Sequence, residues 1–370
     1  MGDDMRVLYD YQIMLNQKYG GISRYFSQLA KYINSDMSDA EALVPLEKSQ
    51  NYYFSNVCEP NISSPNRWHV LVNCFATYKT LFLSKLKNKR IDIVHPTYYF
   101  PSYLYLLPKS LRKFKVVITV HDLIREKFYP DMDNASMGRR RGIIKNADAV
   151  IAISENTKRD LLEMYPEIDS DKVFVVYHGI DVNGSKNCTP VSVNGPYLLF
   201  VGKRDYYKNG DRYIQCIGEL AKEYPNLSFV FVGGGAFTHD EKILINDLEI
   251  KNRTVQINAN DEELNYLYHN ALCFVFPSLY EGFGIPILEA FSCGCPVALS
   301  NCSCFPEIAG DAAAYFDGES VPDMLKVLED IIDDEIYRDK LISLGSEKVK
   351  EYTLEKMVTN TMKVYESVIG

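Results

Sequence analysis

The sequence predicts an α/β protein made of two consecutive Rossmann-like domains, each with a doubly wound parallel sheet. Short apolar segments alternate along the chain with segments of helical periodicity, which is typical of parallel strands joined by helices. A turn-rich stretch at 184–196 interrupts the alternation, and the pattern restarts after it. The 370 residues are enough for two domains of ordinary size.

Composition restricts the class of protein. An apolar content of 46% suits a globular protein with a substantial core. No apolar run approaches the roughly 20 residues of a membrane span, and the start of the chain, with Asp3 and Asp4, lacks the pattern of a signal peptide. Nine scattered cysteines without C-x2-C spacing favour a reduced setting over a zinc or disulfide framework. We therefore expect a cytoplasmic protein.

Charge is distributed unevenly. Residues 1–185 hold 24 Lys and Arg against 21 Asp and Glu, whereas residues 186–370 hold 16 against 28. Within 60–145 there are 16 basic and 5 acidic residues. A nucleic-acid binder is usually basic over a whole domain, so we expect no nucleic-acid partner.

The first domain is predicted to open with a strand at Met5–Tyr9, followed by the loop Lys18–Gly21 and an amphipathic helix. The apolar face of this helix consists of Ile22, Phe26, Leu29 and Ile33. Two adjacent glycines, Gly20 and Gly21, let a ligand approach the backbone closely, although the same pair also suits a simple tight turn. Residues 45–70 show little periodicity and are expected to be irregular.

A basic helix is predicted from Val72 to Lys89, with Phe75, Tyr78, Leu81, Phe82 and Leu86 between Lys79, Lys85, Lys87 and Lys89. Such a pattern occurs on membrane-surface elements. It also occurs on ordinary surface helices with a solvated lysine face, which the pattern alone favours. The aromatic loop Tyr98–Tyr105 follows, and its rings suit a sugar face, a lipid interface or an ordinary core.

Further strands are predicted at Val116–Val120, Ala149–Ile153 and Val173–Val176, with a helix at Asn156–Met164. His121 and Asp122 directly follow the first of these strands. A histidine in such a position is more often structural than catalytic.

The second domain repeats the alternation, and Leu354–Ile369 is predicted as the last helix. The other predicted elements are strands Tyr197–Val201, Ser228–Val232 and Thr254–Ile257 and helices Asp211–Glu223, Glu241–Leu248 and Glu262–His269. Gly233–Gly235 lacks the third glycine of a dinucleotide fingerprint.

Phe276–Pro296 is the most informative stretch. An apolar strand at Leu272–Phe276 leads into a loop with Gly282 and Gly284, and Pro286 then opens a helix that ends at Gly294 and Pro296. The backbone N–H groups of Phe283, Gly284 and Ile285 therefore point out of a helix N-terminus at the carboxyl end of a strand. Ligands bind at this place in open α/β sheets.

Two acids flank these N–H groups. Glu281 alone suits a solvated loop acid, and Glu289, predicted in the first helical turn, is stabilised there by about 0.3–1 kcal/mol through the helix dipole. Together with the donors between them, the two carboxylates indicate a polyhydroxylated ligand, since a carboxylate accepts hydrogen bonds from two vicinal hydroxyls.

Two cations follow the first strand of the second domain, in the segment Gly202–Asn209. Arg204 and Lys208 stand beside a helix N-terminus that Asn209 is expected to cap. Cations at such a terminus suit a diphosphate, although two basic residues in a loop are usually only solvated.

The run Ser278–Gly284, together with the E-x7-E spacing of Glu281 and Glu289, resembles the signature of retaining glycosyltransferases of family 4. The resemblance covers nearly the whole chain and is strongest over 197–317. It implies the GT-B fold, in which two Rossmann-like domains face each other across a cleft. It also implies an acceptor-side domain at 1–185, a nucleotide-sugar-binding domain at 196–350 and a C-terminal helix within 351–370 that crosses back to the first domain.

The resemblance assigns roles to residues at matching positions. It implies that Glu281 and the N–H groups of Phe283, Gly284 and Ile285 hold the sugar and that Glu289 holds the ribose. Arg204, Lys208 and Gly21 would bind the diphosphate, and His121 would lie near the anomeric centre. His121 and Glu281 are the catalytic candidates, whereas His95, His178, His239 and His269 are expected to be structural.

The implied reaction transfers a hexose from a nucleotide diphosphate sugar to a hydroxyl of a glycolipid or polysaccharide acceptor. GDP-mannose is the first expectation for the donor, with UDP-glucose and UDP-N-acetylglucosamine as alternatives, because Asn258 stands where the family usually has glycine beside the base. A nucleotide-sugar epimerase and a non-catalytic binding protein remain rival classes. The basic, aromatic region 72–115 would contact the inner face of the cell membrane peripherally.

No metal or other cofactor is expected. Asp131-Met132-Asp133 and Asp169-Ser170-Asp171 match the D-x-D triplet of another glycosyltransferase fold, but neither follows an apolar strand.

Overall fold

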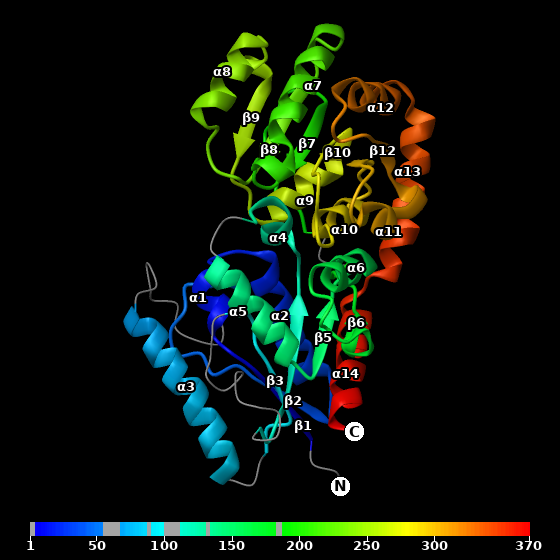
Figure 1. The fold of residues 1–370 in the computed structure, drawn as a ribbon. Helices are drawn as coiled ribbons and strands as arrows, with labels where there is room; N and C mark the ends of the chain where they lie inside the picture. The colour runs from blue at the N-terminus through cyan, green and yellow to red at the C-terminus, as the bar shows by residue number, and fades with distance from the viewer. Residues whose placement is uncertain (1–3, 55–66, 87–89, 100–111, 131–133, 183–186) are drawn as a thin grey trace. The chain divides into compact units, whose positions relative to one another are not determined.

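The computed structural model describes residues 4–54, 67–86, 90–99, 112–130, 134–182 and 187–370 (Figure 1). They form two compact units, one comprising Met1–His178 and Leu354–Gly370 and the other Gly179–Thr353. The chain enters the second unit at Gly179, ahead of the stretch 184–196 that we predicted as the linker. Each unit contains one six-stranded sheet in which all paired strands are parallel, which confirms the predicted α/β fold class.

The sheet of the first unit has the strand order β2-β1-β3-β4-β5-β6. Its strands are β1 (Met5–Tyr9), β2 (Ala40–Leu43), β3 (Ile93–His95), β4 (Lys115–Val120), β5 (Ala149–Ala152) and β6 (Val173–Val175). The helices of this unit are α1 (Gln12–Asn16), α2 (Gly21–Asp36), α3 (Arg67–Leu86), α4 (Ile124–Phe128), α5 (Asn134–Asn146), α6 (Glu155–Met164) and α14 (Leu354–Ile369).

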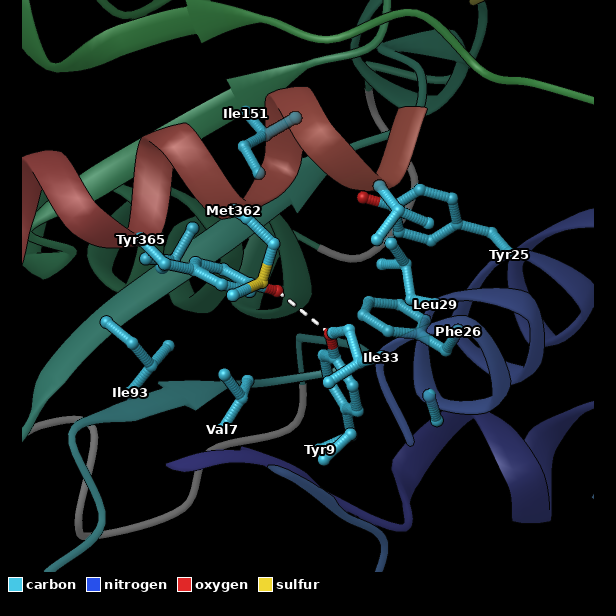
Figure 2. Close-up of a cluster of buried hydrophobic side chains, with 14 of the residues drawn as sticks. Val7, Tyr9, Tyr25, Phe26, Leu29, Ile33, Ile93, Ile151, Met362 and Tyr365 are labelled. Carbon is cyan, nitrogen blue, oxygen red and sulfur yellow. Dashed lines mark hydrogen bonds between the residues drawn. The ribbon is translucent and has the colours of Figure 1, made fainter. Parts of the chain in front are cut away.

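Alternating side chains of these strands fill two apolar clusters, because successive residues of a strand point to opposite faces. Val7 and Tyr9 belong to one cluster and Leu8 to the other. The last helix, α14, packs into the first cluster through Val358, Met362 and Tyr365 (Figure 2). There the hydroxyls of Tyr9 and Tyr365 lie 3.0 Å apart and form a hydrogen bond, so α14 is joined to β1 by both apolar and polar contacts.

One surface of α3 differs from the ordinary amphipathic helix that the pattern favoured. Phe75 and Phe82 are 69% and 62% exposed, whereas Asn73 and Thr77 are buried. The reason is local, because the Asn73 amide accepts a hydrogen bond from Glu47 N (2.8 Å) and donates one to Lys48 O (2.8 Å). Asn73 and Thr77 therefore face inward, whereas Phe75, Phe82 and Lys79 lie on the exposed surface. The side chain of Lys85, together with Lys87 and Lys89, lies outside the described part of the chain, as do residues 100–105 of the aromatic loop.

Within the described residues, no helix has the length and apolar character that a membrane crossing requires.

The sheet of the second unit has the order β12-β11-β10-β7-β8-β9. Its strands are β7 (Tyr197–Val201), β8 (Ser228–Val232), β9 (Thr254–Ile257), β10 (Cys273–Phe276), β11 (Val297–Ser300) and β12 (Ala314–Phe316). Its helices are α7 (Gly210–Glu223), α8 (His239–Asp247), α9 (Asp261–Asn270), α10 (Ile285–Ser292), α11 (Phe305–Ala309), α12 (Val321–Asp333) and α13 (Glu335–Lys348). The central strands β10 and β11 are buried at every position, as expected for strands covered on both faces.

Strand order reverses between β7 and β10, since the chain continues from β7 to β8 on one side and adds β10 to β12 on the other. The loops that follow these two strands meet at their carboxyl ends, where Leu279 N donates a 2.7 Å hydrogen bond to Tyr207 O. Such a switch point is the usual ligand site of an open parallel sheet. It contains Lys208 and Glu281.

Candidate functional site

The loop after β10 passes into α10 through a left-handed residue. Gly284 has φ +93°, and a Cβ atom there would lie 2.9 Å from Ile287 Cδ1, so glycine is required both for the backbone conformation and for space. Ile285 is the first helical residue and Pro286 follows in the same turn. No side chain caps α10, and the first N–H groups of a helix have no intrahelical acceptor. That the N–H groups of residues 283–285 donate to a ligand stays a prediction.

Glu281 and Lys208 come together from the two neighbouring loops. The Lys208 ammonium forms an ion pair with Glu281 Oε1, and their side chains are only 16% and 11% exposed. The same ammonium lies 5.1 Å from the ring centroid of Phe276. A cation and a carboxylate held together in a mostly buried place interact more strongly than a surface pair. The structure thus joins two residues that the sequence placed 73 positions apart.

The backbone around Glu281 is held by a serine that sequence reasoning missed. Ser303 Oγ donates a hydrogen bond to Glu281 O (2.6 Å) and accepts one from Glu281 N (3.2 Å). Ser303 itself has φ +56°, which is uncommon for a residue other than glycine. Cys304 Sγ donates to the same carbonyl at 3.3 Å, and Ser300 Oγ donates to Ser278 O. The segment after β11 thus fixes the loop after β10.

The signal for this contact was present in the sequence. Residues that follow an apolar strand beside the signature strand must lie at the same sheet edge, and Val297–Ser300 is such a strand.

Arg204 is held by the protein itself. Its Nε forms a 2.7 Å ion pair with Glu241, and its Nη atoms donate to the carbonyl oxygens of Gly233, Gly235 and Ala236 at 3.0–3.2 Å. The three consecutive glycines therefore wrap the guanidinium. The arginine side chain is 4% exposed, so a diphosphate would meet Lys208 more readily than Arg204. A contact between Arg204 and the diphosphate stays a prediction.

Two local predictions in the second unit were wrong. Asn209 precedes α7 in a left-handed conformation and makes no capping hydrogen bond; its amide instead donates to Pro277 O (3.1 Å) and Gly318 O (2.6 Å). Asn209 therefore connects the loop after β7 to the loop after β10. Glu289 lies in the second turn of α10, because the helix begins at Ile285, and no acid occupies the first turn. The helix dipole therefore stabilises the half-buried Glu289 carboxylate less than we predicted.

The side chain of Phe283 is used by the fold, and a role of its backbone N–H in ligand binding stays a prediction. Its side chain is 2% exposed and packs edge-on against Tyr352, with ring centroids 5.8 Å apart.

In the first unit, His121 ends β4 among aromatic groups. Its ring is stacked on His178 with centroids 5.6 Å apart and meets Tyr25 edge-on at 5.2 Å. Burial lowers the pKa of His121 well below its ordinary value, and the neighbouring His178 acts in the same direction, so the imidazole is neutral at pH 7. Its Nε2 is buried and has no hydrogen-bond partner in the described structure.

Gly21 is the first residue of α2 and is exposed, one position before Ile22, which lines the same pocket as His121. A Cβ atom on Gly20, the residue before it, would lie 2.3 Å from Gln17 Oε1, so the pair of glycines also makes room for this side chain. Gly21 and His121 belong to the first unit, and the other predicted site residues belong to the second.

Two of the histidines expected to be structural lie in the core of the first unit. His95 bonds Tyr365 Oη (2.7 Å) and Thr119 Oγ1 (2.9 Å) through its two ring nitrogens. Burial lowers the pKa of His95 and of His178 to about 3.

The described residues contain no group of three or more His, Cys, Asp and Glu side chains that could hold a metal ion. Of the two D-x-D triplets, 131–133 lies outside the described part of the chain. In the other, Asp169 accepts a 3.0 Å hydrogen bond from Asp171 N and caps a short 3-10 helix, Ser170–Lys172.

Both halves of the chain match models of known protein families. Residues 19–183 match the model described as Glycosyltransferase Family 4. Residues 186–348 match the model described as Glycosyl transferases group 1.

Curated relatives and solved structures agree with these matches. O-antigen chain mannosyltransferase B of Escherichia coli is 32% identical over 173 residues, which are 46% of this chain and 45% of the relative. O-antigen chain mannosyltransferase RfbU of Salmonella typhimurium is 29% identical over 58% of this chain and 61% of its own. The crystal structure of Anabaena HepE in complex with UDP-glucose has a TM-score of 0.76 at 15% identity and covers 98% of this chain and 100% of its own. The matched region spans less than two thirds of either curated relative.

Proposed function

Because the chain belongs to the family 4 glycosyltransferases of GT-B fold, we propose that it transfers a hexose from a nucleoside diphosphate sugar to a hydroxyl, with retention of configuration. In this reaction the bond between the anomeric carbon and the phosphate oxygen breaks, and a bond to the acceptor oxygen forms on the same face. The leaving phosphate takes the acceptor proton.

The observation that carries the proposal is the contact of Lys208 with Glu281 at the switch point of the second sheet. A diphosphate that replaces Glu281 as the partner of Lys208 frees the carboxylate to accept hydrogen bonds from sugar hydroxyls. As the bond to the phosphate breaks, negative charge grows on the leaving group, so a cation already in place stabilises the transition state more than the ground state. The N–H groups of residues 283–285 at the N-terminus of α10 are proposed as further donors on the sugar side.

The remaining roles follow the family pattern. We assign the sugar to Glu281 and the N–H groups of residues 283–285, the ribose to Glu289, and the diphosphate to Lys208 with contributions from Arg204 and Gly21. His121 is assigned to the anomeric centre. As a neutral imidazole it can donate or accept a hydrogen bond without adding charge.

GDP-mannose is the proposed donor, and this choice is supported by the two relatives named as mannosyltransferases. UDP-glucose is the second candidate, because HepE was solved with it. Thermal unfolding should be recorded with GDP-mannose, UDP-glucose and UDP-N-acetylglucosamine, since a bound ligand raises the melting temperature by mass action. The donor should then be incubated with lipid-linked and soluble glycans, and a glycoconjugate product is expected. A free altered nucleotide sugar without such a product would instead show an epimerase.

The acceptor is proposed to be a glycolipid or polysaccharide at a membrane surface. Trp68, Leu71, Phe75 and Phe82 are all more than half exposed and follow each other at intervals of three, four and seven residues, which places them on one side of α3. Together with the excess of basic residues in 60–145, this favours a helix lying on an anionic bilayer.

Flotation with vesicles tests the membrane contact. The protein should float with vesicles containing anionic lipid, and Phe75→Ser with Phe82→Ser should abolish this. The exposed Ile336→Ser variant, in the second unit, serves as control. Equal flotation of all three proteins would reject the contact.

A further inference from the structure

The first unit contains a pocket that opens between the start of α2, the segment after β4, and helices α4 and α5. Its lining includes Tyr98 and Tyr99, His121, Arg125 of α4, and Met137 and Arg139 of α5. All of these residues belong to one unit. The pocket therefore combines aromatic and apolar surface with cations, one neutral histidine and the carboxylates of Asp122 and Glu126.

The inner wall of the pocket contains an arginine, Arg140, that already makes several protein contacts. Arg140 forms a 3.0 Å ion pair with Glu126 and donates to the carbonyl oxygen of Asp122. Its guanidinium also lies 4.5 Å from the ring centroid of Tyr99. Glu126 accepts a further 2.8 Å hydrogen bond from Tyr165. The buried Glu126 carboxylate is thus neutralised by Arg140, and the Arg140 guanidinium is part of the pocket wall.

His121 leaves an unsatisfied polar atom at this wall. The residue is 9% exposed, and its Nε2 lacks a hydrogen-bond partner in the described structure. A buried polar atom without a partner is unfavourable, and a ligand hydroxyl at Nε2 would supply the missing hydrogen bond. A hydroxyl-bearing ligand therefore suits the His121 end of the pocket.

The outer part of the pocket presents two cations from different helices. Arg125 and Arg139 are exposed, and neither forms an ion pair with any residue that the structure describes. Their neighbours on α5 differ, because Arg140 is paired with Glu126 and Arg141 with Glu167. Two guanidinium groups at one rim suit an anion with several oxygens, since arginine donates bidentate hydrogen bonds to phosphate and carboxylate.

Aromatic surface lies in the same pocket. The Tyr99 hydroxyl is used by the fold, donating to Thr119 O at 2.9 Å. The ring of the half-buried Tyr98 lies 5.4 Å from that of Tyr99 at 54°. Such rings contact the apolar face of a sugar.

We propose that this pocket binds an acceptor sugar that carries an anionic group, with its hydroxyl at His121 and its phosphate or carboxylate at Arg125 and Arg139. The proposal rests on the proposed function and adds the chemical class of the acceptor. The two arginines act as specificity-determining residues, because a neutral acceptor would leave them without a partner.

Binding of matched probes by the full chain tests the proposal. Mannose 1-phosphate and methyl α-mannoside share the sugar ring and differ in the anion, and inorganic phosphate presents the anion alone. Calorimetric titration should show mannose 1-phosphate binding at least about tenfold more tightly than either of the others, the factor that corresponds to about 1.4 kcal/mol. Equal affinity for the two sugars would overturn the proposal, and equal affinity for inorganic phosphate would show a free-phosphate site instead.

Two sets of variants test whether Arg125 and Arg139 cause the preference for the phosphorylated sugar. Arg125→Gln with Arg139→Gln should remove the preference for the phosphorylated sugar, whereas Arg141→Gln, on the same helix but paired with Glu167, should retain it. Retention in the double variant, or equal loss in the control, would overturn the assignment.

Nucleotide-sugar binding, measured by thermal shift on the same samples, separates this proposal from the proposed function. Wild type that binds no nucleotide sugar contradicts the function. A double variant that keeps nucleotide-sugar binding while losing the anion preference supports both.

Discussion

The loop at Glu281 and the pocket at His121 are both polar, but they satisfy their polar groups differently. Around Glu281 the protein supplies the partners, with Lys208 on the carboxylate and Ser303 on the backbone. In the pocket, His121 Nε2 has no partner, and Arg125 and Arg139 form no ion pair within the described structure. In the first region a ligand must separate Lys208 from Glu281, whereas the second has capacity left for one. We infer that donor recognition exchanges partners that the fold already supplies, whereas acceptor recognition adds partners that the fold lacks.

Removal of the Glu281 carboxylate should have the largest effect. Glu281→Ala is expected to lower transfer by about 10²–10³-fold, the loss typical of removing one group that stabilises the transition state, while nucleotide binding persists. Steady-state transfer and nucleotide titration measure the two properties. Glu319→Ala, an exposed acid of the same unit, is the control. Undiminished transfer in Glu281→Ala would refute the role.

Acid should weaken the first unit through its buried histidines. The pKa of His95 and that of His178 are lowered to about 3 by burial, from an ordinary value near 6.5. Between these values the unfolded chain binds protons that the folded chain does not, so their contribution to stability is full above about pH 6.5 and falls as the pH drops toward 3. Each histidine contributes a slope of up to about 1.4 kcal/mol per pH unit.

Urea unfolding at pH 6, 5 and 4 measures this slope. His95→Gln keeps one donor and one acceptor without titrating, and it should flatten the pH dependence. An unchanged slope in His95→Gln would contradict the assignment.

Loss of the Ser303 hydroxyl should have a smaller effect on the region around Glu281. Ser303→Gly accepts the left-handed backbone and removes the two hydrogen bonds to Glu281. At about 1 kcal/mol per bond, loss of both should lower kcat/KM by roughly thirtyfold, and Ser303→Ala should lower it further through backbone strain. A kinetic comparison of the two variants measures the difference. If Ser303→Gly equals wild type, the serine does not position the loop.

Chelation should have the smallest effect. We predict that EDTA leaves the transfer rate within about twofold of its starting value, because Lys208 and helix N-termini supply positive charge at the proposed diphosphate site. A collapse of the rate that Mn²⁺ restores would show a required metal.

The Glu281 loop could be predicted from the sequence to a larger extent than the His121 pocket. Local patterns determine β1, β7, β8 and β9 to the residue, because short, mainly apolar or β-branched runs bounded by turn residues have few alternatives. Glu281 and the left-handed Gly284 were found because they belong to one contiguous run. Ser303 was not, since its contact spans 22 residues and depends on β11 lying beside β10.

Contacts between distant segments caused the other misses. The outward aromatic side of α3 follows from the hydrogen bonds of Asn73 to residues 47 and 48, which no helical periodicity contains. Arg204 looked available in the sequence because its partner Glu241 lies 37 positions away. The pocket at His121 draws on α2, α4 and α5, and so it becomes visible only once the sheet is assembled.

Calorimetric titration of nucleotide sugars and of the matching nucleoside diphosphates is the most direct measurement of the donor site. Lys208→Met should weaken both ligands, whereas Glu281→Gln should weaken only the sugar-bearing one, because the lysine is assigned to the diphosphate and the glutamate to the hexose. If neither substitution changes either affinity, the activated sugar is not held at the junction of these two loops.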